Sequence, residues 1–388
     1  MTEPKLRFKA DDGGEFPDWE EKTIDDVAEC LDNLRIPVNA EERRKRVGVI
    51  PYYGAGGIQG YIDDYLFDEE LVLLLEDGDA FDNFQTKSIA QFVVGKSWVN
   101  NHAHVLRANE NSYFLFASLE HKDIRKWTQL AGASRKKLLK DSMLKIVVNV
   151  PSLPEQQKIA DFLSTIDTVI EKQKATVEAW EERKKGVMQK LFSQEVRFKA
   201  DDGSEFPDWE EKKLSELFKK IIEKNRLDLP ALTIIQGAGT IRRDESERRI
   251  TYDEKGLKNY KAVQKNDFIV HLRSFEGGLE IANQDGIVSP AYHVYRGNDE
   301  VNPLFYYPYF RSSNFIEGKL SVCVTGVRDG KNIEMNSFDE LLIPHPCLAE
   351  QQKIVDCLSS LDDVIEKQKA TLEAWKEMKK GLLQKMFV

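Results

Sequence analysis

Cysteine is scarce in this chain of 388 residues, and long hydrophobic runs are absent from it. The four cysteines, Cys30, Cys323, Cys347 and Cys357, form no CxxC pair and have no histidine at metal-ligand spacing. We therefore expect reduced and mostly buried thiols rather than a disulfide framework. No apolar run reaches the 18 or so residues of a membrane span, and the start lacks the apolar stretch of a signal peptide. These absences argue against a membrane protein and predict a cytoplasmic one.

An excess of positive charge is also missing. The chain has 56 Lys and Arg against 66 Asp and Glu, a net charge of −10, whereas DNA binding requires clustered cations that neutralise phosphates. Local basic clusters do occur at residues 43–46, 135–137, 242–243 and 248–249. Each cluster could equally be a solvated surface. The total charge therefore weighs against DNA binding without excluding it, because the distribution of charge matters more than the sum.

Motifs of catalysis are missing as well. The chain has no [DNS]PP[YFW] methyl-transfer motif and no glycine-rich S-adenosylmethionine loop, and Ala90 stands where a phosphate loop ending at Lys96 would need glycine. Residues 17–22 (PDWEEK), repeated at 207–212, contain the PD and ExK of metal-dependent nucleases. In such enzymes these parts come from two adjacent strands, whereas here they are contiguous. A boundary turn that packs Trp19 is the better interpretation, and a self-contained metal-dependent DNA nuclease stays as an alternative.

The main signal of the sequence is an internal repeat of two blocks. Residues 7–22 recur as residues 197–212, with 15 of 16 positions identical. Residues 155–192 recur as residues 350–387, with 27 of 38 positions identical. The two offsets, 190 and 195 residues, are similar, so both blocks belong to one duplicated frame.

The segments between these blocks differ from each other. Residues 23–150 and 213–346 show almost no resemblance at either offset. A solenoid would repeat throughout, and a plain domain duplication would diverge evenly along its length. The contrast predicts a constant frame that holds two different modules, in agreement with a length that favours two or more domains.

Each 38-residue block has the pattern of one long helix. Its apolar positions follow alternating steps of four and three, which is the spacing of a seam between packed helices. The predicted seam of the first block contains Ile159, Phe162, Ile166, Val169, Gln173, Thr176, Trp180, Arg183 and Val187, widened by Leu163, Ile170 and Val177. Pro154 suits the first turn of such a helix. A helix of this length is about 57 Å long, so two of them could hold modules apart on the scale of turns of DNA.

These features predict an α+β protein. Two mixed α/β modules are separated and joined by two long helices that form an antiparallel coiled coil, in a pseudo-twofold arrangement. The first module is predicted at residues 1–152 and its helix at residues 153–193. The second module is predicted at residues 194–347 and its helix at residues 348–388. Each module includes one copy of the 16-residue block.

Short strands are expected inside the modules, because apolar runs alternate there with glycine-rich turns. The predicted strands are Val47–Ile50, Leu71–Leu75 and Lys145–Val150 in the first module, and Leu232–Ile235, Asp267–Leu272 and Leu341–Ile343 in the second.

Loops of both modules carry donors and rings that could meet phosphates or base edges. Asn can form two hydrogen bonds with adenine, and Lys can bond to guanine. A glycine run lets the backbone approach a ligand closely. The candidates are Arg43, Arg44, Tyr53, Gly56, Lys96, Asn100, Asn101, His102, Arg135 and Lys136 in the first module, and Arg242, Arg243, Tyr260, Arg273, Ser289, Tyr292, Arg328 and Lys331 in the second. Since Arg135 and Arg328 both precede a long helix, we expect them to clamp phosphates. Ordinary turns and fold contacts are the open alternative.

Over its whole length the chain resembles the specificity subunits of type I restriction-modification systems. The resemblance rests on the alternation of constant and variable segments and on short phrases. These phrases are residues 52–57 (YYGAGG), 98–104 (WVNNHAH), 288–292 (VSPAY), 325–328 (TGVR) and 154–159 (PEQQKI). The second copy has Ala349 where the proline of the last phrase would stand, which should soften only the helix start.

The resemblance implies that each module is a target recognition domain for one half of a bipartite, asymmetric site in double-stranded DNA. The helix pair would set the gap between the halves. Two methyltransferase (modification) subunits would flip out and methylate an adenine in each half-site, and ATP-driven restriction subunits would cut remote DNA. S-adenosylmethionine, ATP and Mg²⁺ are thus expected in partner subunits, with no cofactor, metal or catalytic residue in this chain. A coiled-coil scaffold that does not bind DNA is a further alternative.

Overall fold

The computed structural model of the chain describes residues 4–54, 56–131, 135–246, 254–326 and 331–387. These residues confirm the predicted α+β class and form two compact units. Unit 1 consists of residues 1–176 and 368–388, and unit 2 of residues 177–367. Within the described residues, no helix is long and apolar enough to span a membrane.

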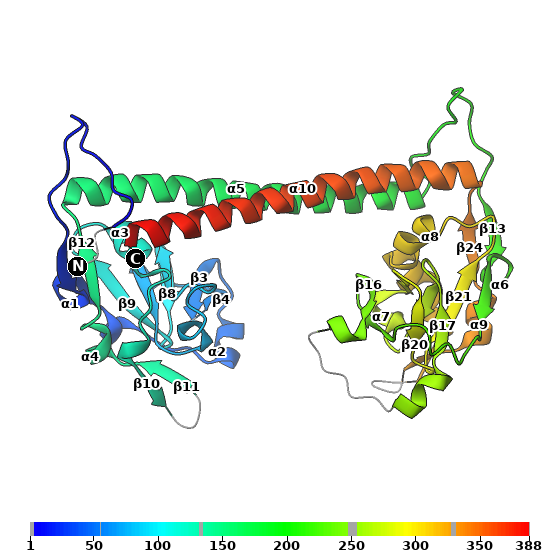
Figure 1. Cartoon of the computed structure of the whole chain (residues 1–388), viewed down its shortest axis with the longest axis horizontal. Helices are drawn as coiled ribbons and strands as arrows, with labels where there is room; N and C mark the ends of the chain where they lie inside the picture. Colours follow the sequence, from blue (N-terminus) through cyan, green and yellow to red (C-terminus); the bar gives the residue numbers. More distant parts are fainter. Residues whose placement is uncertain (1–3, 55, 132–134, 247–253, 327–330, 388) are drawn as a thin grey trace. The chain divides into compact units, whose positions relative to one another are not determined.

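The two predicted long helices are present. Helix α5 (Leu153–Phe192) has Pro154 in its first turn, and helix α10 (Leu348–Phe387) is its repeat (Figure 1). Both helices extend over the boundary at which the units are divided. Each unit therefore contains part of α5 and part of α10.

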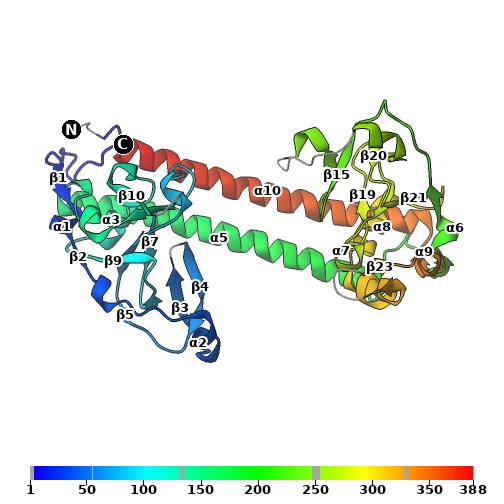
Figure 2. The ribbon, with the colours of Figure 1, turned by 90° about the horizontal axis from the view of Figure 1, so that it is seen from below.

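In unit 1 the two helix segments run antiparallel. Leu163 near the start of α5 shares a hydrophobic core with Leu383 near the end of α10. Further along α5, Gln173 donates a hydrogen bond to the side chain of Gln368 at 2.7 Å, on an earlier part of α10. The partners on α10 come earlier as α5 advances, which is the order of an antiparallel pair. Figures 1 and 2 show the last turns of α10 near the start of α5 in this unit.

In unit 2 the helix segments are ordered in the same way. Lys184 forms an ion pair with Asp362, and Leu191, two turns later in α5, shares a core with Ile354, two turns earlier in α10. The predicted antiparallel pairing is thus present within each unit. It is built from the same helix positions, because Lys184 and Asp362 correspond to Lys379 and Asp167 in the repeat.

The buried stripe of the helices is shifted by one position from part of the predicted seam. Phe162 is 39% exposed, whereas its neighbour Leu163 is fully buried. Leu163 begins a heptad row that is repeated at Leu358 in α10, and further members of both rows are buried as well. The reason is that each helix packs both on the other helix and on a domain. The buried stripe therefore includes Leu163 and Val177 together with Ile159 and Ile166 of the predicted seam.

The repeated 16-residue block ends in a strand that pairs with the strand before a long helix. In unit 1, β1 (Glu20–Thr23) is antiparallel to β12 (Val147–Val150). In unit 2, β13 (Glu210–Lys213) is antiparallel to β24 (Leu342–His345). Each pair brings the start of a domain next to its end.

The domain of unit 1 contains two four-stranded sheets. Its strands are β2 (Ala28–Cys30), β3 (Ile50–Gly54), β4 (Gly57–Ile62), β5 (Phe67–Asp68), β6 (Leu71–Leu75), β7 (Ala90–Val93), β8 (Lys96–Val99) and β9 (Ala103–Ala108). The first sheet has the order β2-β9-β6-β7 and is antiparallel throughout. The second has the order β4-β3-β8-β5, in which β3 and β8 are parallel.

Unit 2 repeats this topology. Its strands are β14 (Phe218–Ile221), β15 (Leu232–Ile235), β16 (Gly239–Arg242), β17 (Lys261–Val263), β18 (Phe268–Val270), β19 (Glu280–Ile281), β20 (Gly286–Val288) and β21 (His293–Gly297). The order β14-β21-β18-β19 matches the first sheet of unit 1. The pairs β15-β16 and β17-β20 are joined by a parallel bridge between Ala231 and Ile287, in the order of the second sheet. Two modules without visible sequence resemblance therefore have one fold.

Most of the remaining elements also correspond in order. Unit 1 has α1 (Ile24–Val27), α2 (Ala40–Lys45), α3 (Ser112–Leu119), α4 (Lys140–Met143) and the hairpin of β10 (Thr128–Ala131) and β11 (Arg135–Leu138). Unit 2 has α6 (Leu214–Leu217), α7 (Ser274–Gly277), α8 (Pro303–Phe310), α9 (Met335–Asp339) and the hairpin of β22 (Val324–Thr325) and β23 (Asn332–Ile333). The exception is that α2 precedes β3, whereas α7 lies between β18 and β19. Short helical turns are η1 (Asp32–Leu34), η2 (Asp79–Phe81), η3 (Arg125–Trp127), η4 (Arg243–Glu245), η5 (Glu254–Asn259), η6 (Asn314–Lys319) and η7 (Leu320–Cys323).

One predicted strand is wrong. The predicted strands Leu71–Leu75 and Leu232–Ile235 are confirmed, but residues 47–49 lie outside any strand and β3 begins only at Ile50. Val47 and Val49 are more than 80% exposed, so their apolar character does not mark a buried strand. Here the chain is shaped by close packing, since a Cβ on Gly48 would lie 2.1 Å from the carbonyl oxygen of Ile62.

Candidate nucleic-acid interface

A buried carboxylate fastens the repeated block of unit 1 to the start of α5. Glu155 is fully buried and accepts hydrogen bonds from the guanidinium of Arg7 at 3.1 and 2.7 Å and from the indole N–H of Trp19 at 3.2 Å. The hydrogen bond with Glu155 raises the pKa of Arg7 despite the opposing effect of burial. The helix N-terminus also favours a negative charge at this position. Trp19 packs as predicted, with 6% of its surface exposed.

Unit 2 contains the same arrangement. Arg197 donates to Glu350 at 3.1 and 2.8 Å, and the indole of Trp209 donates to Glu350 at 2.9 Å. Glu350 is fully buried as well. The repeated blocks are therefore identical because each one closes the same contact on a helix start. We call these two sites the Arg-Glu-Trp clasps.

The nuclease-like residues of the repeated block do not converge. The side chains of Asp18 and Asp208 are 96% and 104% exposed, and each lies beside the arginine of its clasp. Glu20 pairs with Lys22 on the same strand at 3.1 Å. Within the described part of the chain, no three His, Cys, Asp or Glu side chains are grouped so that they could hold a metal ion. The block is thus accounted for by the clasp.

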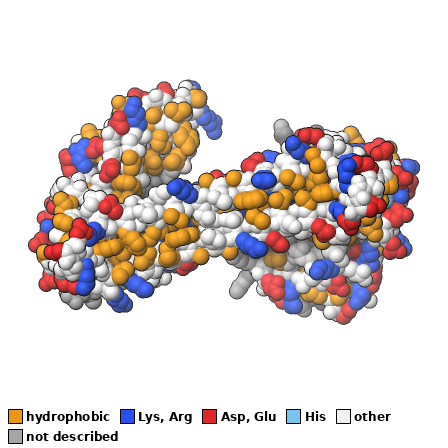
Figure 3. Space-filling view, turned by 90° about the horizontal axis from the view of Figure 1, so that it is seen from above, with side chains coloured by type: hydrophobic (Ala, Val, Ile, Leu, Met, Phe, Trp, Pro, Cys, Tyr) orange, Lys and Arg blue, Asp and Glu red, His pale blue; other side chains and the backbone are white. Residues whose placement is uncertain are grey.

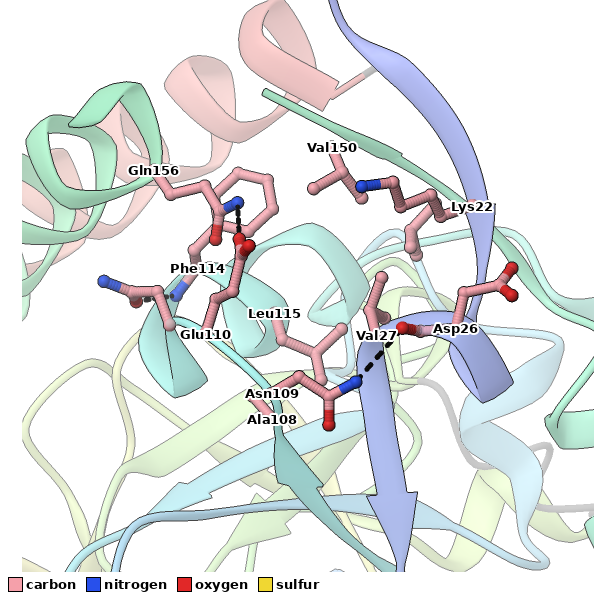
Figure 4. Close-up of a pocket in the computed structure, with 12 residues that line it drawn as sticks. Lys22, Asp26, Val27, Ala108, Asn109, Glu110, Phe114, Leu115, Val150 and Gln156 are labelled. Carbon is pink, nitrogen blue, oxygen red and sulfur yellow. Dashed lines mark hydrogen bonds between the residues drawn. The ribbon is translucent and has the colours of Figure 1, made fainter. Parts of the chain in front are cut away.

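A cavity of about 210 Å³ lies beside the clasp of unit 1, where β1, α1 and the starts of α3 and α5 meet (Figure 4). Most of its polar groups bond within the fold. Gln156 donates to the carboxylate of Glu110 at 2.6 Å, and Asn109 donates to the carbonyl oxygen of Asp26 at 3.1 Å. Lys22 also lines the cavity.

The corresponding region of unit 2 has a longer connection. Two residues separate β9 from the helix cap Asn111, whereas four separate β21 from the corresponding cap Asn302. In that longer connection Glu300 pairs with Lys212 at 2.8 Å and lies 3.4 Å from His345. The lining of the unit 1 cavity does not specify a ligand.

In unit 1 the structure brings Tyr53, Asn100 and His102 together. The backbone N–H of Asn100 donates to the carbonyl oxygen of Tyr53 at 3.0 Å, and its side-chain oxygen accepts from the N–H of His102 at 2.8 Å. The Asn100 amide also donates to Gln59 at 3.3 Å. Asn100 is thus buried and shapes the turn, while the neighbouring Asn101 is exposed.

Cations lie over aromatic rings elsewhere in this domain. The guanidinium of Arg43 lies 4.7 Å from the ring centroid of Tyr52, and the ammonium of Lys96 lies 4.5 Å from that of Tyr65. Arg44 is exposed on α2. Such cation–π contacts hold the charge at the surface, where it can also meet a phosphate.

Arg46 was not among the predicted site residues but also lies over an aromatic ring. Arg46 lies 4.5 Å above the ring of Trp98 and pairs with Asp63 at 2.7 Å. It belongs to the basic cluster at residues 43–46, but the aromatic partner is distant in sequence. Only the fold reveals the contact.

The two predicted phosphate clamps fall in matching hairpins. Arg135 is the first residue of β11, and Lys136 pairs with Asp82. Arg328 lies outside the described residues, in the connection between β22 and β23. Both hairpins precede a short helix and the strand that leads to a long helix. The role of Arg135 and Arg328 as phosphate clamps stays a prediction.

In unit 2 the candidate rings and cations gather around Tyr260 and Tyr292. Arg243 donates to the hydroxyl of Tyr260 at 3.2 Å, and Lys261 donates to the carbonyl oxygen of Tyr292. The ring of Tyr292 meets that of His271 edge-to-face, at 6.3 Å between centroids. Burial raises the pKa of Tyr292, so its hydroxyl remains a neutral hydrogen-bonding group.

The other candidates of unit 2 have separate side-chain partners. Arg242 forms an ion pair with Asp244 at 2.7 Å. Lys331 lies 5.5 Å from the ring centroid of Phe275 on α7, and Arg273 immediately precedes α7. Ser289 accepts a hydrogen bond from the backbone N–H of Ala291 at 3.3 Å and so stabilises a turn.

Both units carry a Gly-Ala-Gly tripeptide at the same turn, which sequence reasoning also missed. Residues 54–56 begin at the last residue of β3, before β4, and residues 237–239 end at the first residue of β16, after β15. Ala55 lies outside the described residues. The repeated tripeptide could have indicated from the sequence that these two turns correspond. Its offset of 183 residues, however, differs from the offsets of 190 and 195 residues of the repeated blocks.

Hydrophobic side chains gather over the part of unit 1 that contains β3 and β4 (Figure 3). Large exposed side chains of this region include Val47, Val49, Ile58 and Tyr61. Clusters of exposed apolar side chains are typical of interaction sites. In a DNA-binding domain, such side chains can also contact thymine methyl groups.

Comparison with known proteins gives consistent matches. The model of the family described as "Type I restriction modification DNA specificity domain" matches twice, at residues 17–179 and 207–374. A protein described as a type I restriction enzyme specificity subunit, from Haemophilus influenzae, is 38% identical over 155 residues, 39% of this chain and 38% of that relative's length. The type I restriction enzyme MjaVIII specificity subunit of Methanocaldococcus jannaschii is 25% identical over 97% of this chain and 94% of its own.

The fold is also similar to a solved structure. The crystal structure of the type I restriction-modification S subunit from M. genitalium superposes with a TM-score of 0.55 over 100% of this chain and 99% of that one. The sequence identity is 13%, so this likeness concerns the fold alone.

Proposed function

Because the chain belongs to the type I restriction-modification DNA specificity family, we propose that it is the DNA-reading subunit of such a system, in which each unit reads one half of a bipartite, asymmetric site. The observation that carries this proposal is one topology with two sets of surface residues. A protein that reads two different half-sites needs one way of approaching DNA and two different reading surfaces. The matching strand orders of the two domains supply the first requirement, and their unlike loops supply the second.

Cationic loop residues would position the protein on DNA. In unit 1 these are Arg43, Arg44 and Lys96 beside the second sheet, together with Arg135 and Lys136 of the hairpin. Phosphate contacts fix register and orientation, while base contacts select sequence. Amide and imidazole groups such as those of Asn101 and His102 suit base edges. An acidic total charge is compatible with this assignment, since only the loops have to meet phosphates.

The helix pair would connect the two reading events. Each helix has 40 residues and so a length of about 60 Å. We infer that this length sets the gap between the half-sites and that the exposed helix faces bind two modification subunits. S-adenosylmethionine, ATP and Mg²⁺ would act in the modification and restriction subunits, and this chain would contribute no catalytic residue. The complex would work in the cytoplasm.

Mapping of methylated adenines tests the proposal. The host genome is sequenced for methylation with and without this gene, and then with residues 23–150 replaced by the module of another such chain. We expect one bipartite motif that disappears with the gene, and a module exchange that changes one half of it. An unchanged motif after exchange, or no sequence preference in the complex, would refute the proposal.

A nuclease assay distinguishes this proposal from the main alternative, a self-contained metal-dependent nuclease. Under the proposal, the purified chain with Mg²⁺ leaves DNA intact. Cutting that is abolished by Asp18→Ala or Asp208→Ala would instead support the self-contained nuclease. If the complex does not retard DNA even at low salt, the chain would instead be a coiled-coil scaffold that does not bind DNA.

A further inference from the structure

The turn between β15 and β16 in unit 2 is held at its base by one buried carboxylate. The turn consists of residues 236–238, which are exposed. Glu280 on β19 is fully buried, and its two oxygens accept hydrogen bonds from the backbone N–H groups of Gly237 at 2.7 Å and Gly239 at 3.1 Å. The carboxylate therefore binds the middle residue of the turn and the residue that follows it.

Two further donors complete the surroundings of Glu280. Arg311 donates to one oxygen at 2.6 Å, and the hydroxyl of Tyr307 donates to the other at 3.0 Å. A carboxylate has about four acceptor positions, and four donors now occupy them. Burial and the charge of Glu280 raise the pKa of Tyr307 to about 12, so this hydroxyl keeps its proton. Glu280 therefore has no capacity left for a ligand, and it ties the turn to Tyr307 and Arg311.

The backbone of the turn has little freedom. Gly237 and Gly239 have φ values of +90° and +79°, which other residues rarely adopt. A Cβ on Gly239 would lie 2.6 Å from the carbonyl oxygen of Ile281. Asn283 donates to the carbonyl oxygen of Ala238 at 2.7 Å. The exposed tip is therefore presented in one conformation.

The matching turn of unit 1 is contacted by neutral side chains. Gln91 on β7 takes the place of Glu280 in the sheet order, and its amide donates to the carbonyl oxygen of Gly54 at 3.4 Å. Gln59 on β4, beside this turn, accepts from Asn100 at 3.3 Å. Both bonds join neutral groups and are longer than the four bonds to Glu280. Charge-assisted bonds are roughly twice as strong as neutral ones.

We propose that Glu280 is a positioning residue for DNA reading, because it fixes the turn at residues 236–238 and so determines how strictly unit 2 selects bases in its half-site. The inference rests on the proposed function of the chain. A rigid turn leaves polar groups unpaired when the wrong base is present, whereas a loose turn adapts to it. The side chain of Gln236 and the exposed backbone groups of the turn are the atoms that would meet base edges.

The test compares base preferences in the two half-sites. The complex with its modification subunits methylates a DNA library in which both half-sites are randomised, and sequencing gives the preference at every position. Glu280→Gln keeps the shape of the side chain but places an amide donor opposite other donors. We expect it to lower the discrimination at one or more positions of the unit 2 half-site by about tenfold, while the unit 1 half-site keeps its preference.

Three further variants make the result decisive. Tyr307→Phe removes one bond to Glu280 and should relax the same half-site to a smaller degree, which provides a test if Glu280→Gln does not fold. Gln91→Leu should relax only the unit 1 half-site. Asp228→Asn removes an exposed carboxylate paired with Arg226 in unit 2 and should change neither.

Each outcome has a distinct meaning. Unchanged preferences in Glu280→Gln and Tyr307→Phe, or an equal loss in both half-sites, would overturn the positioning role and leave the proposed function standing. A wild-type complex without preference in either half-site would overturn both.

Discussion

Lys379 in unit 1 lies between the carboxylates of Glu120 and Asp167, at 2.8 Å from each. The matching residue of unit 2, Lys184, pairs with Asp362, the counterpart of Asp167. The helix positions are thus the same in both units, and the additional carboxylate of unit 1 comes from the domain. In this way a variable domain can strengthen its attachment to a constant frame.

The residue that supplies this carboxylate has a different use in unit 2. Glu120 is the C-cap of α3, and Arg311 is the C-cap of the corresponding helix α8. Arg311 carries the opposite charge and contacts Glu280, which supports the exposed turn. One position in the fold therefore stabilises the frame contact in unit 1 and the candidate reading turn in unit 2. The comparison suggests that the domains share a scaffold but distribute their buried charges differently.

The largest expected loss of stability comes from breaking a clasp, and it should be the same in both units. Arg7→Met and Arg197→Met each leave a buried glutamate without its arginine, and removing one partner of a buried ion pair costs about 3–5 kcal/mol. Hydrogen exchange resolved by residue, with added urea, measures the loss in each unit separately. Asp18→Asn is the matched control, because this carboxylate is exposed. If only one of the two variants lowers the stability of its own unit, the two clasps are not equivalent.

A smaller effect should distinguish the units. Lys379→Met leaves the largely buried Glu120 and the partly buried Asp167 without their shared cation, and we expect a loss of about 3 kcal/mol in unit 1. Lys184→Met should cost about 0.5–1 kcal/mol in unit 2, because Asp362 is half exposed. Urea unfolding of the two variants under identical conditions measures the difference. Equal losses of stability in the two variants would contradict the expected difference between Lys379 and Lys184.

Acid should weaken unit 1 through Asp32. Burial opposes ionisation of this carboxyl, but the hydrogen bond and charge of His104, with the N–H of Val105 and the charge of Arg35, leave its pKa below the usual value. A lowered folded pKa means that the stabilisation is present above the unfolded pKa and is lost as pH falls through the folded pKa. Asp32→Asn should therefore flatten the acid dependence of unit 1. Unfolding followed between pH 7 and pH 2 tests this, and an unchanged slope would contradict it.

The smallest effect concerns DNA affinity. Arg44→Ala removes an exposed cation and should lower the slope of log affinity against log salt by about 0.9. Arg242→Ala should lower it less, because Asp244 already pairs with Arg242. Binding of the complex to its site at several salt concentrations gives both slopes. A larger loss for Arg242→Ala would mean that its ion pair opens on DNA.

Much of the frame was predictable because its signals are local or repeated. Pro154, the heptad spacing and the near-identical blocks determine where α5 and α10 begin and how they pair. The run Leu71–Leu75 is a strand because all its side chains are buried. The sequence could predict residues of the candidate site, but it could not predict which of them lie together. Tyr53 and Asn100, for example, are 47 residues apart and meet only because β3 and β8 are parallel neighbours.

The shift of the helix stripe from Phe162 to Leu163 has the same origin. A heptad pattern shows that a helix has a packing face, but the domain that covers a second side of the helix decides which neighbours are buried. In unit 1 that domain contributes Phe114 and Ala117 to the core around Leu163. These contacts join residues that are far apart in the chain, so the pattern alone does not contain them.

The sequence by itself thus determined the duplicated frame, the two long helices and the presence of two unlike modules, since these follow from repetition and short-range periodicity. Only the tertiary structure decided that the modules have one topology, that the repeated block closes on Glu155 and Glu350, and that Glu280 supports an exposed turn. The physical reason is that strand order and buried polar contacts are set by partners distant in sequence. Many different side chains can satisfy the same strand order, and a carboxylate finds its donors only after the chain has folded.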